Sequence, residues 1–126
     1  MNLLIVDDSA SVRRLIAEIM TPYALDIREC SDGAAAVIAY GAKKPDLVLM
    51  DIRMSVVDGI QATRQIRALD PAAKIVMVTN LDDPGLREAA LREGACGYAV
   101  KEHLFELPRF IETLAHERTE PCKLCQ

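Results

Sequence analysis

The 126-residue sequence has no tryptophan, few aromatic residues of any kind and no long apolar stretch. Aromatic residues make up 4% of the chain and hydrophobic residues 51%, so aliphatic side chains must form most of the core. The longest run without a charged residue, 33–42, has only ten residues, which is too short to cross a bilayer. We therefore expect a protein that does not insert into membranes.

The chain lacks an excess of positive charge. The 15 Lys and Arg residues are outnumbered by 19 Asp and Glu residues, which gives a net charge of −4. This balance argues against direct binding of nucleic acid through bulk charge. Four cysteines are too few to indicate a disulfide scaffold in a chain of this length, so we expect a cytoplasmic, reducing location.

The length predicts one domain, and apolar runs alternate with helical patterns along it. Short apolar runs, typical of strands covered on both faces, occupy 3–6, 24–30, 47–50, 75–78 and 97–100, of which 24–30 has the most mixed character. Helical spacing of apolar residues or helix-start signals follow each run, over 12–20, 33–42, 59–69, 84–93 and 107–115. Five successive strand–helix pairs predict an α/β sandwich with a parallel sheet and right-handed crossovers.

Polar residues stand where four of these strands end. Asp7 and Asp8 follow the first strand, Asp51 follows the third, and Thr79 and Lys101 end the fourth and fifth. The carboxyl ends of parallel strands meet at one edge of a sheet, so these side chains are expected to share one pocket. Clustered carboxylates repel unless a cation is present, and oxygen ligands in an open site suit Mg²⁺. The set predicts phosphoryl transfer to a carboxylate.

Each residue also has an ordinary structural alternative. Asp8 or Ser9 could cap the first helix, Thr79 could be a plain strand residue, and Lys101 could be a solvated charge. The joint placement of all of them at strand ends favours a common site over these separate explanations.

Five motifs in a fixed order carry a family resemblance. They are Val-Asp-Asp-Ser at 6–9, Asp-Leu-Val-Leu-Met-Asp at 46–51, Val-Asp-Gly at 57–59, Val-Thr-Asn at 78–80 and Gly-Ala-Cys-Gly-Tyr-Ala-Val-Lys at 94–101. Together they resemble the receiver domain of bacterial response regulators. The resemblance implies a flavodoxin-like fold, with a five-stranded parallel sheet of order 2-1-3-4-5 and five helices. It places the receiver domain at 1–116 and leaves 117–126 as a C-terminal tail, expected to be flexible.

The resemblance also implies a role for each site residue. Asp51 corresponds to the phosphoacceptor. Asp8 corresponds to a direct Mg²⁺ ligand and Asp7 to one that acts through water, with Asp51 itself and the backbone carbonyl of Arg53 completing the protein ligands.

Three further residues complete the implied machinery. Lys101 corresponds to the lysine that pairs with a phosphoryl oxygen, and Thr79 to the hydroxyl that moves onto the phosphoryl group. Tyr98 occupies the position of an aromatic switch, although a plain core tyrosine would fit the same sequence.

The implied function is a phosphorylation-activated switch in a two-component phosphorelay. A sensor histidine kinase or histidine phosphotransfer protein would phosphorylate Asp51, and a downstream protein would bind the face formed by the fourth helix, fifth strand and fifth helix. Such a domain promotes only its own phosphorylation and dephosphorylation, so we expect no enzyme acting on a separate substrate. The resemblance leaves open a dimer that forms on phosphorylation.

Three positions depart from the family pattern, and two of them, Glu102 and Asn80, keep an alternative open. Glu102 stands where a proline usually follows the site lysine, Ser55 replaces another usual proline, and Asn80 is large for the position after Thr79. The alternative is a degenerate receiver that binds partners without phosphorylation. A small Mg²⁺-dependent phosphohydrolase of the haloacid-dehalogenase type is a weaker rival, because Asp7 and Asp8 are adjacent rather than arranged as Asp-x-Asp.

The peptide bond between Lys101 and Glu102 is expected to be trans, since no proline ring lowers the cost of the cis form.

The tail carries a Cys-x-x-Cys pair, Cys122 and Cys125. Two cysteines with His116 as the only nearby histidine do not complete a tetrahedral zinc site. We therefore expect the pair not to be a structural site of the domain.

Overall fold

The computed structural model describes the backbone of residues 1–117 and the side chains of residues 1–114. Of the predicted tail, 117–126, only the backbone of Glu117 is described, as the last residue of a helix, and the Cys122–Cys125 pair lies outside the described residues. The elements, in chain order, are β1 Asn2–Val6, α1 Ala10–Met20, η1 Thr21–Tyr23, β2 Asp26–Cys30, α2 Gly33–Ala42, β3 Leu47–Met50, α3 Gly59–Leu69, β4 Ile75–Thr79, α4 Pro84–Arg92, β5 Gly97–Val100, η2 Lys101–Glu106 and α5 Leu107–Glu117, where η marks a 3-10 helix.

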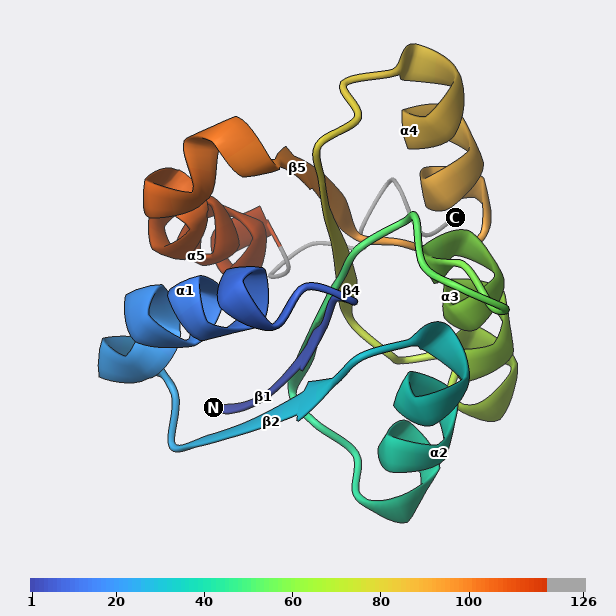
Figure 1. The fold of residues 1–126 in the computed structure, drawn as a ribbon, viewed down its shortest axis with the longest axis horizontal. Helices are drawn as coiled ribbons and strands as arrows, with labels where there is room; N and C mark the ends of the chain where they lie inside the picture. The colour runs from blue at the N-terminus through green and yellow to red at the C-terminus, as the bar shows by residue number, and fades with distance from the viewer. Residues whose placement is uncertain (118–126) are drawn as a thin grey trace.

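The five strands form one parallel sheet in the order β2-β1-β3-β4-β5, as predicted. Helices cover both faces of this sheet. Figure 1 shows α1 and α5 on one side and α2, α3 and α4 on the other. This is the flavodoxin-like arrangement that the family resemblance implied.

Successive side chains along each central strand point to opposite faces of the sheet, so the core has two layers. In β1, Leu4 and Val6 pack into the layer that includes Ala62 and Ile66 of α3. Leu3 and Ile5 point the other way, toward α1 and α5. Every residue of β3 and β4 is buried, which explains why these strands are continuous apolar runs without a polar face.

The helices begin at side-chain caps that the sequence supplies. Ser9 accepts a hydrogen bond from the backbone of α1, which therefore starts two residues before its apolar periodicity. Three helices begin at an aspartate whose side chain accepts a hydrogen bond from the helix backbone: α2 at Asp32, α3 at Asp58 and α4 at Asp83. At α3, the side-chain oxygen of Gln61 also accepts a hydrogen bond from the Asp58 N–H, which completes a capping box.

The predicted strand 24–30 is too long at its start. The strand begins at Asp26, because the N–H of Ala24 bonds back to Thr21 and closes η1 instead. As an edge strand with only β1 beside it, β2 leaves Asp26 and Glu29 exposed, which accounts for its mixed sequence.

Gly59 sets the position of the loop that follows β3. Its N–H donates to the carbonyl of Ile52 at 2.7 Å. A Cβ atom at Gly59 would collide with the backbone carbonyl of Asp51, so only glycine lets α3 start this close to the strand end.

Among the residues that the structure describes, no helix combines the length and the apolar character needed to span a bilayer.

Candidate functional site

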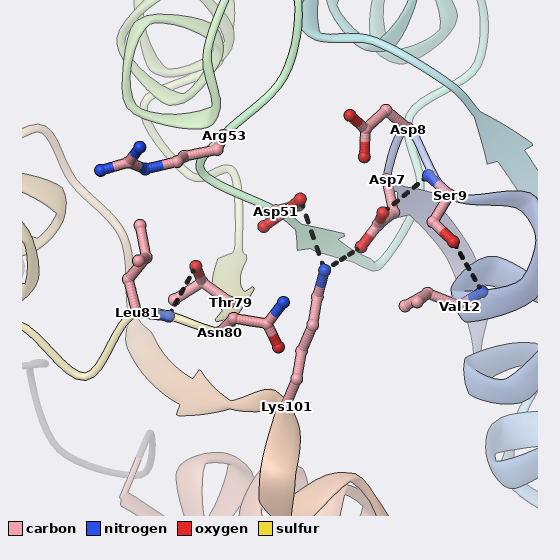
Figure 2. A pocket seen from close by; sticks show the side chains of 10 residues that line it. All are labelled: Asp7, Asp8, Ser9, Val12, Asp51, Arg53, Thr79, Asn80, Leu81 and Lys101. Atoms are coloured by element: carbon pink, nitrogen blue, oxygen red, sulfur yellow. Dashed lines mark hydrogen bonds and ion pairs between the residues drawn. The ribbon is translucent and has the colours of Figure 1, made fainter.

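A pocket of about 380 Å³ opens at the carboxyl end of the sheet (Figure 2). Its walls come from the ends of β1, β3, β4 and β5 and the loops that follow them. The lining includes every residue predicted for phosphoryl and metal chemistry, namely Asp7, Asp8, Asp51, Arg53, Thr79 and Lys101. The expectation that these strand-end residues share one pocket is confirmed.

The Lys101 ammonium lies between two carboxylates. Its Nζ atom is 2.7 Å from Oδ2 of Asp7 and 3.4 Å from Oδ2 of Asp51. Only 10% of the Lys101 side chain is exposed, and the two carboxylates are more deeply buried still. A buried arrangement of this kind holds together because each charge has an opposite partner.

Asp7 is held on both its backbone and its side chain. Its Oδ1 accepts the N–H of Ser9 at 2.9 Å, and Nη1 of Arg13 donates to its backbone carbonyl at 2.6 Å. Its Oδ2 is fully buried and, within the described residues, has the Lys101 ammonium as an ion partner but accepts no well-aligned hydrogen bond. This oxygen therefore retains capacity for a further cationic partner.

The two oxygens of the buried Asp51 carboxylate have different partners. Oδ1 accepts the N–H of Ile52 at 2.9 Å, while Oδ2 faces Lys101. Burial raises the pKa of Asp51 above its ordinary value, the Lys101 ammonium opposes this rise, and the nearby Asp7 charge adds to it. The result is a carboxylate whose negative charge is incompletely compensated by the chain itself.

The three aspartates fit a hard divalent cation. One carboxylate oxygen from each of Asp7, Asp8 and Asp51 lies within 4.8 Å of the others. Asp8 is exposed, so the cluster is open to solvent on one side, as a site that keeps several waters on its metal requires. Oxygen-only donors, open geometry and the poorly satisfied Asp7 oxygen together fit Mg²⁺.

Thr79 and Asn80 form the wall contributed by β4. Thr79 is buried, and its Oγ1 accepts the N–H of Leu81 at 3.2 Å. Asn80, which follows β4, is exposed and lines the same pocket, and the effect of its size on this space stays a prediction.

Tyr98 is buried in β5, and its hydroxyl donates to the backbone carbonyl of Leu81. The guanidinium of Arg87 lies over the ring, with 4.9 Å between its central carbon and the ring centroid. Burial raises the pKa of the Tyr98 hydroxyl, and Arg87 offsets the rise only in part. The hydroxyl therefore stays protonated and available as a donor.

Arg53 lines the pocket, but its exposed side chain extends away from the three carboxylates (Figure 2). The role expected for its backbone carbonyl stays a prediction.

Glu102 does not displace the site lysine. The described backbone contains no cis peptide bond, so the bond after Lys101 is trans, as expected. The chain then forms η2 directly, with Glu102 exposed in its first turn. Lys101 still reaches both carboxylates, so this departure from the family pattern leaves the acceptor pocket intact.

Sequence reasoning missed three contributors. Arg13 lies near the start of α1, and its bond to the Asp7 carbonyl depends on the exact direction of a long side chain. Leu81 acts through its backbone groups, which carry no sequence signal. Arg87 faces the Tyr98 ring only because α4 packs on β5, and a helix-periodicity argument that included charged residues could have suggested it.

Comparison with known proteins gives a consistent result. The family model described as "Response regulator receiver domain" matches residues 3–113. The chain is 36% identical to the chemotaxis protein CheY of Listeria monocytogenes over 115 residues, which covers 90% of this chain and 95% of that protein. It is also 36% identical to CheY of Halobacterium salinarum over 114 residues, covering 90% and 93% of the two chains.

Solved structures show the same likeness in three dimensions. The CheX–CheY–BeF3–Mg²⁺ complex from Borrelia burgdorferi contains a chain with a TM-score of 0.82 and 29% identity, covering 91% of this chain and 89% of that one. A two-component response regulator of the LuxR family from Aurantimonas has a TM-score of 0.84 and 29% identity, covering 94% and 97%.

Proposed function

This chain belongs to the receiver domain family of response regulators, and we propose that Asp51 is the residue on which it is phosphorylated. As a receiver homologous to CheY, it is a phosphorylation-activated switch in two-component signalling rather than a classical enzyme. The observation that carries the assignment of Asp51 is the placement of its buried carboxylate in an open pocket, beside Lys101 and two further aspartates.

Asp51 is suited to act as the nucleophile. Its Oδ1 is held by the Ile52 N–H, which fixes the carboxylate plane, and the incomplete compensation of its charge favours bond formation with an electrophilic phosphorus. In the transfer, a bond forms between an Asp51 oxygen and phosphorus as the bond from phosphorus to the donor breaks. Hydrolysis reverses the state when water attacks the phosphorus and releases phosphate.

Asp7, Asp8, Asp51 and the backbone carbonyl of Arg53 are proposed to hold Mg²⁺. When bound, the ion supplies positive charge that offsets the charge of the incoming phosphoryl group. The fit rests on the mutual proximity of the three carboxylates and on the exposed position of Asp8.

Lys101 and Thr79 are proposed to bind the phosphoryl oxygens. Lys101 already reaches the acceptor, and its ammonium has three donors to divide between Asp7, Asp51 and a phosphoryl oxygen. Thr79 accepts a bond from Leu81 N–H, which leaves its own hydroxyl hydrogen free to donate to the new group. Phosphorylation thereby gives both residues partners that the unmodified site does not supply.

Tyr98 is proposed to transmit this change to the surface. A cavity of about 240 Å³ lies where α4, β5 and α5 meet, and its lining includes Arg87, Tyr98, His103 and Phe110. A shift of Tyr98 alters the wall of this cavity directly. A downstream protein that prefers one arrangement is then recruited in proportion to its differential affinity.

The phosphoryl donor is proposed to be a sensor histidine kinase or a histidine phosphotransfer protein, and dimerisation on phosphorylation would use the same surface. The presence of Lys101 within reach of Asp51 favours this function over the degenerate receiver that Glu102 and Asn80 had suggested.

The test is to incubate the chain with acetyl phosphate and Mg²⁺ and to measure its intact mass. We expect one phosphate adduct, lost in Asp51→Asn and on chelation of the metal. Asp26→Asn is the matched control, because Asp26 is exposed at the opposite end of the sheet and pairs only loosely, at 3.8 Å, with Lys43. An adduct of undiminished yield in Asp51→Asn contradicts the proposal.

A further inference from the structure

Arg87 is the one charged side chain that covers the Tyr98 ring in the described structure. A guanidinium within about 6 Å of an aromatic centroid is attracted by the negative face of the ring. At 4.9 Å this contact satisfies the distance, and both residues line the cavity between α4, β5 and α5.

The guanidinium of Arg87 also has an acidic neighbour. Nη2 of Arg87 lies 3.7 Å from Oδ1 of Asp82, the residue just before the cap of α4. Both of these side chains are substantially exposed, so the pair contributes little stability by itself. Its geometric effect is to keep the guanidinium near the β4–α4 loop, over the ring.

The ring that Arg87 covers is the one whose hydroxyl reaches Leu81. The Leu81 carbonyl accepts from Tyr98 and the Leu81 N–H donates to Thr79, so a ring held in place also holds one end of this hydrogen-bonded chain. Without Arg87, the Tyr98 ring would keep its apolar packing and its hydroxyl bond in this position but would lose the cationic contact on its face.

We propose that Arg87 is a positioning residue that holds the Tyr98 ring in its buried orientation and so biases the switch before phosphorylation. This rests on the proposed function in one respect, namely that Tyr98 is the switch residue. The bias acts through two contacts that a neutral side chain cannot make together: attraction to the ring face and pairing with Asp82.

The same helix supplies a matched comparison. Arg92 is also exposed on α4, and its described partner is Glu88 at 3.3 Å, one turn away on the same helix. Removing Arg92 changes the charge of the helix by the same amount as removing Arg87 but leaves the Tyr98 contact untouched.

The experiment measures the exposure of the Tyr98 ring without any phosphoryl group or metal. The chain is labelled with 3-fluorotyrosine, and the solvent isotope shift of each ¹⁹F resonance reports how far that ring is exposed. The chain has three tyrosines, and Tyr98→Phe identifies the resonance of interest. The variants are Arg87→Ala, Arg87→Met, Arg87→Lys and Arg92→Ala, each checked for an unchanged cooperative melting transition.

We expect Arg87→Ala and Arg87→Met to lower the ratio of buried to exposed Tyr98 ring by about two- to fivefold, which corresponds to about 0.4–1 kcal/mol. Methionine keeps most of the length without the charge, so its agreement with alanine assigns the effect to the cation. Arg87→Lys should restore at least half of the lost buried population, and Arg92→Ala should behave as the parent.

Unchanged Tyr98 exposure in both Arg87→Ala and Arg87→Met overturns the proposal, as does an equal change in Arg92→Ala. Failure of the proposed function is a separate result: Asp51 would then not take up phosphate from acetyl phosphate, while the ring exposure measured here would still depend on Arg87.

Discussion

The hydroxyl groups of Thr79 and Tyr98 are joined through a single residue, Leu81. Thr79 Oγ1 accepts the Leu81 N–H at 3.2 Å, and the Tyr98 hydroxyl donates to the Leu81 carbonyl. Thr79 lines the acceptor pocket, whereas Tyr98 lines the cavity between α4, β5 and α5. The backbone at Leu81 therefore connects the proposed phosphorylation site to the proposed binding face.

This connection predicts that Thr79→Ala and Tyr98→Phe are energetically coupled. Each substitution removes one hydrogen bond to Leu81 and should lower the free energy of unfolding by about 1 kcal/mol. In the double variant we expect a coupling energy of at least about 0.5 kcal/mol, because loss of one bond frees the loop and weakens the other. Urea unfolding of the four proteins measures it.

Tyr40→Phe provides the control for that cycle. Its hydroxyl bonds to Asp70 rather than to Leu81, at 2.6 Å. Thr79→Ala combined with Tyr40→Phe should be additive. Additivity of the Thr79 and Tyr98 variants as well would show that Leu81 does not couple them.

A second prediction concerns metal binding. Mg²⁺ that binds only the folded chain stabilises it by mass action, so the melting temperature should rise with Mg²⁺ and fall back when the metal is chelated. Asp8→Asn removes one of the three clustered carboxylates and should abolish most of this rise. Asp26→Asn, far from the cluster, should retain it. A rise of equal size in Asp8→Asn would exclude Asp8 as a ligand.

The fold was predictable because local signals agree with one another. Apolar runs such as 47–50 and 75–78 are strands buried on both faces, and Asp32, Asp58 and Asp83 cap helices where the sequence places them. The edge strand begins two residues later than predicted, because exposure weakens the apolar pattern and Ala24 closes η1 instead.

The members of the site that lie at strand ends were predictable, Thr79 as well as the charged residues. Asp7, Asp51 and Lys101 carry their chemistry in side chains at strand ends, so topology alone brings them together. Leu81 contributes backbone groups, and Arg87 contributes a side-chain direction. The backbone groups of Leu81 carry no sequence signal, and the contact of Arg87 depends on how α4 packs on β5.

A third prediction concerns pH. The hydrogen bond from Tyr40 lowers the pKa of Asp70, with smaller help from the Ala72 N–H and Lys44. A lowered pKa means that the ionised carboxylate stabilises the folded chain above the unfolded pKa of about 3.9, and that this contribution is lost as pH falls through the folded value. Tyr40→Phe should therefore cost more stability near neutral pH than at about pH 3.

Asp70→Asn tests the charge in that pair. An asparagine accepts a hydrogen bond from Tyr40 but does not titrate. In the Asp70→Asn background, Tyr40→Phe should cost the same stability at both pH values. If the cost of Tyr40→Phe in the parent were equally independent of pH, the Asp70 charge would have no part in the interaction.

The last prediction concerns Lys101, whose ammonium is the cation that the described structure places between Asp7 and Asp51. Lys101→Met keeps the apolar stem but leaves two buried carboxylates facing each other. Removing one partner of a buried ion pair typically costs about 3–5 kcal/mol, and we expect a loss of this order in metal-free urea unfolding. Lys43→Met is the control, since Lys43 is 61% exposed and should change stability by no more than about 0.5 kcal/mol.

Magnesium separates an electrostatic cause from a packing cause in that variant. If the instability of Lys101→Met comes from carboxylate repulsion, a divalent cation at the aspartate cluster should relieve it, and Mg²⁺ should stabilise the variant more than the parent. If the instability comes instead from lost packing around the lysine stem, Mg²⁺ should stabilise the variant no more than it stabilises the parent.

The variant should also lose phosphorylation by acetyl phosphate even when Mg²⁺ has restored its fold, because no other described ammonium reaches Asp51. Full phosphorylation of the refolded variant would show that Lys101 serves only the stability of the site.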